Sequence, residues 1–220
     1  MDFDLPPDDD PRRLEVRAWL AANPEPTGRE LHDAGYVVPH WPAPYGIDAD
    51  PMHQVIIDEE LRRAGVRRPA NPIGIGWAAP TIALAGTEEQ KERYLGPIFT
   101  GEEFWCQLFS EPDAGSDLAN LATRAVRDGD EYVVNGSKIW TSLGAYADYI
   151  ILLARTDTQT NTKYEGLSYF LAPMKIAGVD PSPIKKLTGE HGFTQTFFND
   201  ARISESCLIG EEGGGWQVAM

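Results

Sequence analysis

The stretch GEEFWCQLFSEPDAGSD (101–117) marks the point at which the pattern of the chain changes. Before it, apolar residues recur mainly at helical spacing, whereas short runs rich in β-branched and aromatic residues follow it. The stretch itself joins one such run, FWCQLFS (104–110), to a loop rich in Asp, Gly and Ser. This change predicts a helical N-terminal domain followed by a β-domain.

Three segments before residue 101 carry helical signals. The segments 10–22 and 50–65 place apolar residues mainly on one side, and Gly65 is a typical stop for the second. In the segment 87–99, Thr87 and Gln90 have the spacing of a capping box, which satisfies free N–H groups of the first turn. The proline-rich segment 37–46 is expected to be an ordered connector without regular structure.

Six runs after residue 101 are expected to be strands, separated by turn formers such as Asp128-Gly129-Asp130. Many short strands in succession predict an antiparallel barrel or sandwich, so the fold class is α+β multidomain. After Gly210 the pattern becomes helical again. The expected strands are 104–110, 121–128, 131–140, 148–155, 167–173 and 194–200.

Composition excludes several classes of partner. The 220 residues are 42% hydrophobic, and 34 acidic against 19 basic residues give a net charge of −15, which argues against nucleic acid and anionic membranes. The N-terminus lacks the pattern of a secretory signal and no segment is apolar enough to span a membrane, so we expect a cytoplasmic protein. Cys106 and Cys207 are interpreted as reduced, buried thiols.

Other common site types find no support. The four histidines, His32, His40, His53 and His191, lack metal-ligand spacing, so no metal site is expected. The segment Gly74–Ala79 formally fits G-x-G-x-x-A, but Pro72 precedes it where a strand should stand, so it is not a dinucleotide fingerprint. The sequence has no G-x-S-x-G motif of a serine hydrolase.

Two segments are candidates for binding a ligand. The segment 109–117 offers a tight turn, with Gly115 for close backbone approach and N–H and hydroxyl groups for polar atoms; a plain loop is the alternative. The segment 135–142 ends a strand with Trp140 beside Thr141 and Ser142, which suits a flat ligand with a polar edge. Taken alone, Trp140 is better explained as a core residue, and Asn135-Gly136 as a bend or hairpin turn.

Together the two segments resemble the acyl-CoA dehydrogenase family. EPDAGSD (111–117) is followed in family order by DGDEYVVNGSKIWTS (128–142) and ADYIILLART (147–156). HWPAPYG (40–46), KLTGEHGFTQTFFNDARI (186–203) and IGEEGGGWQVAM (209–220) are similar to the family too, so the resemblance covers nearly the whole chain from about residue 12.

The resemblance implies an N-terminal helical domain (1–102), a β-barrel flavin-binding middle domain (103–211) and the start of a C-terminal helical bundle (212–220), with FAD between middle domain and bundle. Ser110 would contact the flavin ring and Ser142 its reactive edge; many relatives have Thr at both positions, which keeps the hydroxyl. The implied FAD-binding residues are Phe109, Ser110, Gly115, Ser116, Trp140, Thr141 and Ser142.

The reaction implied by the resemblance removes the α-proton of an acyl thioester with a carboxylate, while the β-hydrogen leaves as hydride to flavin N5. The family base is a Glu of the bundle, and no position up to Met220 matches its usual locations. We therefore assign no catalytic residue, expect the base beyond Met220, and expect the bundle to be missing. An acyl-CoA substrate, electron-transfer flavoprotein as acceptor, and a homo- or hetero-oligomer are also implied.

Three functions stay open. The chain is a fragment or truncated form of an acyl-CoA dehydrogenase, a non-catalytic subunit that supplies part of an FAD site to a heteromeric dehydrogenase, or a β-domain that binds a ligand without redox chemistry. The hydroxyls retained at Ser110 and Ser142 argue against the third. His191 lies in a segment that the family places toward the active site, but we prefer a surface loop. Acyl-chain or steroid preference is not determined by these residues.

Overall fold

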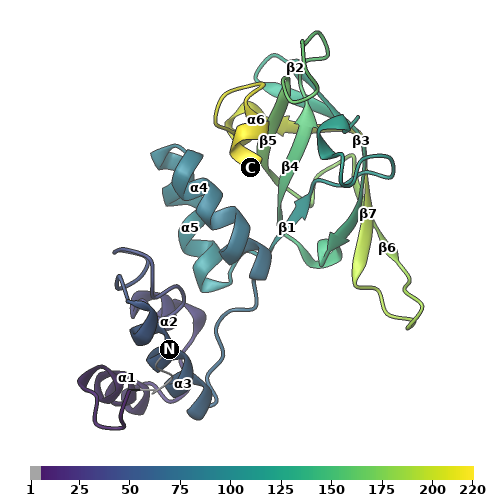
Figure 1. Cartoon of the computed structure of the whole chain (residues 1–220). Coiled ribbons are helices and arrows are strands. Elements are labelled where there is room, and N and C mark those ends of the chain that lie inside the picture. The colour runs from purple at the N-terminus through teal and green to yellow at the C-terminus, as the bar shows by residue number, and fades with distance from the viewer. Residues whose placement is uncertain (1–5) are drawn as a thin grey trace. The chain divides into compact units, whose positions relative to one another are not determined.

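The structure is a computed structural model that describes residues 6–220 (Figure 1). It divides into two compact units, the first formed by residues up to Asn71 with Gly96–Glu102, the second by Pro72–Leu95 with Glu103–Met220. Helices dominate the first unit and a sheet the second, which confirms the expected order of fold types. The expected domain boundaries at 102/103 and 211/212 stay predictions.

The three predicted helices form, and the capping box of α5 is present: the Thr87 N–H donates to Gln90 Oε1 at 3.1 Å, and the Gln90 N–H to Thr87 Oγ1 at 3.2 Å. The segment 37–46 has no regular structure, as predicted. The sequence pattern did not predict the short helix α2. It also did not predict the π-helical turn η1 (Gly74–Ala78), which leads into α4. The α-helices are α1 (Pro11–Ala22), α2 (Gly28–Asp33), α3 (Pro51–Arg63), α4 (Ala79–Ala85), α5 (Glu88–Thr100) and α6 (Gly215–Ala219).

A buried charge network joins α1 to α3 in the helical unit. The side chain of Arg13 is 2% exposed, and its guanidinium donates to both Glu59 and Glu60. Arg17 Nε donates to the other oxygen of Glu60 at 2.8 Å. The hydrogen bond from Arg17, reinforced by Arg13 and opposed by burial, holds the pKa of Glu60 below its ordinary value of 4.5.

Glu60→Gln is expected to destabilise the helical unit by about 2–3 kcal/mol at neutral pH, because it removes one of the two carboxylates that compensate the buried guanidinium of Arg13. Since the folded-state pKa of Glu60 is lowered, this stabilisation is present above the unfolded pKa and is lost as pH falls through the folded pKa. Urea unfolding of wild type and variant should therefore converge in acid. Glu15→Gln, at an exposed position of α1, is the control; equal losses in both variants would contradict the prediction.

All six predicted runs form strands of one eight-stranded sheet. Its order is β6-β7-β3-β2-β4-β5-β8, with β1 paired to β4. Most pairs are antiparallel, but β1–β4 and β2–β4 are parallel, and the sheet does not close into a barrel over the described residues. The strands are β1 (Trp105–Leu108), β2 (Arg124–Asp128), β3 (Glu131–Ser142), β4 (Tyr149–Arg155), β5 (Leu167–Pro173), β6 (Val179–Ile184), β7 (Phe193–Ser204) and β8 (Leu208–Ile209).

Strand β6 was not predicted because it contains Pro181 and Pro183. It lies at the end of the strand order, where a missing N–H donor is tolerated. The Asp128-Gly129-Asp130 turn between β2 and β3 was predicted, and Gly129 adopts a φ of +68° there.

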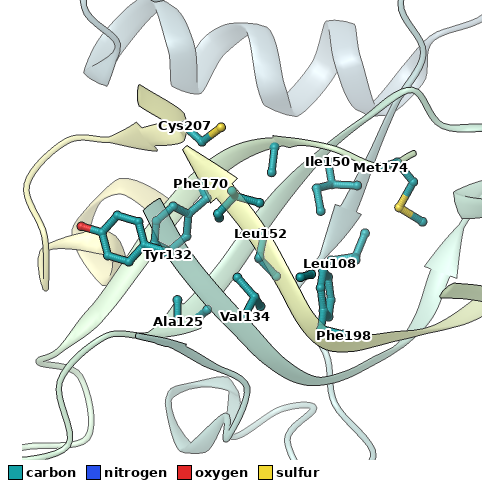
Figure 2. Close-up of a cluster of buried hydrophobic side chains, with 14 of the residues drawn as sticks. Leu108, Ala125, Tyr132, Val134, Ile150, Leu152, Phe170, Met174, Phe198 and Cys207 are labelled. Carbon is teal, nitrogen blue, oxygen red and sulfur yellow. The ribbon is translucent and has the colours of Figure 1, made fainter. Parts of the chain in front are cut away.

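The core of the second unit lies against β4 and β5, whose residues are buried almost without interruption. Ile150, Leu152 and Phe170 pack there with Leu108 and Val134 from neighbouring strands (Figure 2). Helix α6 contacts β5. Cys106 and Cys207 are buried free thiols, as predicted, and burial raises the pKa of Cys207 to about 11.

Candidate flavin site

The structure brings the two candidate segments together. The Ile139 N–H donates to the Ser110 carbonyl at 2.8 Å, and Lys138 Nζ donates to the Phe109 carbonyl at 3.0 Å. The loop after Ser110 is closed by reciprocal backbone hydrogen bonds between Glu111 and Ala114, at 2.9 and 3.1 Å. Residues 109–111 therefore run beside the part of β3 that leads into Trp140.

Trp140 is presented by an irregularity of β3. The register between β3 and β7 shifts between Lys138 and Thr141, and Trp140 between them adopts a φ of +62°. This conformation is strained for a bulky residue, and bulges of this kind re-aim side chains. The indole is 60% exposed, with Phe193 edge-on at a centroid distance of 6.2 Å. The interpretation of Trp140 as a core residue is therefore wrong.

Neighbouring hydroxyls differ in their accessibility. Ser110 and Ser142 are half-buried. Thr141 is 1% exposed and pairs with Thr194 across the strands, and its Oγ1 makes no hydrogen bond within residues 6–220. The side chain of Thr141 thus points inward, which leaves its backbone as the part that a ligand outside the sheet can contact.

Gly115 and Ser116 lie exposed in the loop. A Cβ added to Gly115 would meet nothing within 4 Å, and Gly115 is not in the left-handed region. The packing of the protein itself therefore does not require a glycine here, whereas a ligand that approaches the backbone would. The Ser116 hydroxyl is available next to that open space.

These features fit a flat ring with a polar edge. An exposed indole can cover the ring, two half-buried hydroxyls are donors and acceptors for its rim, and an open glycine leaves room for a polar extension. The residues present therefore suit a flavin, although the seven predicted FAD contacts stay predictions.

Other sequence interpretations are decided by the structure. Asn135 and Gly136 lie inside β3 at a register shift, so the hairpin alternative is wrong. Gly74–Ala79 is helical and does not follow a strand. His191 is exposed in the loop between β6 and β7, which agrees with the preferred surface position. Sequence reasoning missed the buried pair of Lys138 and Glu111, although Lys138 lies on the same alternating face of its strand as Tyr132 and Val134, which is a signal for a buried Lys with an acidic partner.

A cavity of about 330 Å³ adjoins the first segment in the same unit. Phe109 and Tyr169 line it, with their rings edge-on at 5.7 Å, together with Trp77 and Thr81 from η1 and α4 and Gln107 from β1. Burial raises the pKa of the Tyr169 hydroxyl well above its ordinary value. The cavity is thus a recess of mixed polarity beside Ser110, with three aromatic rings in its walls.

Residues 6–220 hold neither a metal-binding cluster nor a membrane-spanning helix. No group of three or more His, Cys, Asp and Glu side chains in that range is placed to hold a metal ion. None of the helices in the same range combines the length and apolar character needed to cross a bilayer.

An open, mostly antiparallel sheet that presents an indole and hydroxyls beside a glycine-containing loop defines a class of domain suited to a flat polar ligand. This chain belongs to the acyl-CoA dehydrogenase family. Residues 10–102 match the acyl-CoA dehydrogenase N-terminal domain and residues 106–201 match the middle domain. Membership of this family supports placing the chain in the class of flavin-dependent oxidoreductases.

Curated relatives from Mycobacterium tuberculosis include acyl-CoA dehydrogenase FadE34, which is 44% identical over a match that covers 92% of this chain and 28% of FadE34. Acyl-CoA dehydrogenase IpdE1 is 40% identical over a match that covers 94% of this chain and 51% of IpdE1. The chain therefore spans about a quarter to a half of these relatives. Similar solved structures include the Tcur3481-Tcur3483 steroid ACAD, with TM-score 0.77 and 34% identity over 99% of this chain and 61% of that one. The structure of the ChsE4-ChsE5 complex from M. tuberculosis has a TM-score of 0.75 and 36% identity, and the match covers 99% of this chain and 60% of that one.

Proposed function

We propose that this chain forms the flavin-binding part of an FAD-dependent acyl-CoA dehydrogenase. The observation that carries the proposal is Trp140, which is held in a strained conformation and exposed beside Ser142 in a chain of this family. Exposing a large aromatic side chain at the expense of backbone strain has a physical reason if a ligand covers it.

Within this proposal, Trp140 covers the ring, while Ser110 and Ser142 contact its polar edge. Phe109 supports the ring from the side of the cavity, and the backbone of Thr141 continues the contact. FAD, when bound, supplies the acceptor for the hydride that leaves the β-carbon of an acyl thioester. The loop residues Gly115 and Ser116 receive the polar extension of the cofactor.

The recess lined by Trp77, Phe109 and Tyr169 is suited to part of an acyl chain, because three aromatic rings line it beside the proposed ring site. Within this proposal, none of residues 6–220 is the catalytic base. The base comes from the helical bundle that follows the middle domain in the family. Electron-transfer flavoprotein as acceptor and a cytoplasmic location remain part of the proposal.

Trp140→Ala is expected to weaken FAD binding about tenfold, because removal of an aromatic contact costs on the order of 1 kcal/mol or more. Titration of the full chain with FAD, followed by flavin fluorescence, measures the dissociation constant. Val126→Ala, at an exposed apolar position of β2, should leave it unchanged. Equal affinities of wild type and Trp140→Ala would remove the observation on which the proposal stands.

A second candidate function is a subunit that contributes part of an FAD site to a heteromeric dehydrogenase. It is favoured by two similar structures, which join pairs of differently named proteins, ChsE4 with ChsE5 and Tcur3481 with Tcur3483. Co-purification with a second related chain, and yellow colour only in the complex, would distinguish this candidate. A chain that binds FAD fully by itself would argue against it.

A further inference from the structure

Lys138 is the buried cation at the centre of the candidate site. Its side chain is fully buried, and Nζ donates to Glu111 Oε1 at 2.7 Å and to the Phe109 carbonyl at 3.0 Å. Burial lowers the pKa of Lys138 to about 8, although Glu111 opposes the change. One ammonium group thus connects β3 with two residues of the 109–117 loop.

Glu111 extends the connection to a third segment. Its carboxylate accepts hydrogen bonds from the N–H groups of Ala122 at 2.6 Å and Thr123 at 2.9 Å, just before β2. Burial alone would raise the pKa of Glu111, but the Lys138 charge and these hydrogen bonds outweigh it and lower the pKa. The carboxylate is therefore ionised and held from two sides.

Stability alone does not account for this pair. Buried ion pairs can often be replaced by uncharged residues of similar size without loss of stability, because desolvation offsets their attraction. The pair joins three segments close to the candidate site: Phe109 lies next to Ser110, Lys138 lies two residues from Trp140, and Glu111 also binds the chain just before β2. The hydrogen bond from the Ile139 N–H to the Ser110 carbonyl joins the same loop to β3.

We propose that Glu111 and Lys138 are positioning residues, which hold residues 109–111 against β3 so that Ser110 and Trp140 face the same ligand. This inference rests on the proposed function for the identity of that ligand. Both groups are buried beneath the backbone that they fix, so they act through Ser110 and Trp140 and do not contact the flavin themselves.

The decisive variant is Glu111→Gln/Lys138→Met, which removes both charges and retains an amide oxygen as acceptor for one of the two N–H groups, Ala122 or Thr123, that bind different oxygens of Glu111. Its urea midpoint should fall only slightly, because one backbone N–H and the Phe109 carbonyl lose a partner, while hydrogen exchange of residues 109–117 in the free protein should accelerate about tenfold. The FAD dissociation constant should rise about tenfold, and the visible circular dichroism of bound flavin should change. Arg202→Met/Glu131→Gln, which removes an exposed pair in the same sheet, should change none of these.

Glu111→Gln/Lys138→Gln, whose second amide can still donate to the Phe109 carbonyl, is the alternative if the methionine variant does not fold; it should show smaller changes of the same kind. Unchanged exchange of residues 109–117 and unchanged flavin dichroism in a folded variant would overturn the positioning role. If wild type binds no FAD but the exchange of residues 109–117 still accelerates in the variant, the positioning role stands and the proposed ligand falls.

Discussion

Phe170→Ala should lower the free energy of unfolding of the sheet unit by about 3–5 kcal/mol. Phe170 is fully buried in β5 and meets the ring of Tyr132 edge-on at a centroid distance of 5.0 Å. Figure 2 shows it among the side chains of the surrounding strands. Alanine would leave a cavity that a sheet held by hydrogen bonds on both sides cannot collapse to fill.

Urea unfolding followed by circular dichroism measures this loss. Phe197→Ala in β7 removes the same group from a side chain that is 37% exposed, and should cost much less. Similar losses at both positions would show that the core does not lie where the structure places it.

Gly136→Ala should destabilise the same unit by about 4 kcal/mol, since it combines backbone strain with overlap. Gly136 has a φ of +144°, a region that only glycine occupies readily. An added Cβ would lie 2.7 Å from Thr123 Cα, where backbone cannot move aside easily. The bulge in β3 therefore requires this glycine.

Gly129→Ala is the matched control for that variant. Gly129 also has a positive φ, +68°, but an added Cβ would meet nothing within 4 Å. Only the left-handed conformation then costs free energy, about 1 kcal/mol. Urea midpoints of the two variants should separate clearly, and equal midpoints would show that contact with Thr123 is unimportant.

Local signals in the sequence predicted the main elements well. The Thr87–Gln90 capping box and the runs that became β4 and β5 depend on neighbours within a few residues, so they are readable without tertiary structure. Helix α2 was missed although Thr27 and Glu30 form a capping box at its start, because its six residues are too few to show an apolar period. Strand β6 was missed because its prolines argue against a strand unless its place at an edge is known.

The candidate site shows the same division. The two segments and their order, which carried the family resemblance, are properties of the sequence, and the family comparison confirmed that resemblance. The exposure of Trp140 and the inward position of Thr141 cannot be read from the sequence. Both depend on a register shift between β3 and β7, which are about 50 residues apart in the chain.

Sequence by itself therefore determined the longer helices and most of the strands, where the pattern changes near residue 101, and which family the chain resembles. Tertiary structure alone decided that Lys138 is buried against Glu111 and that Ser110 lies beside Ile139. The physical reason is that periodicity and capping act over a few residues, whereas burial and cross-strand register are set only when distant segments pack.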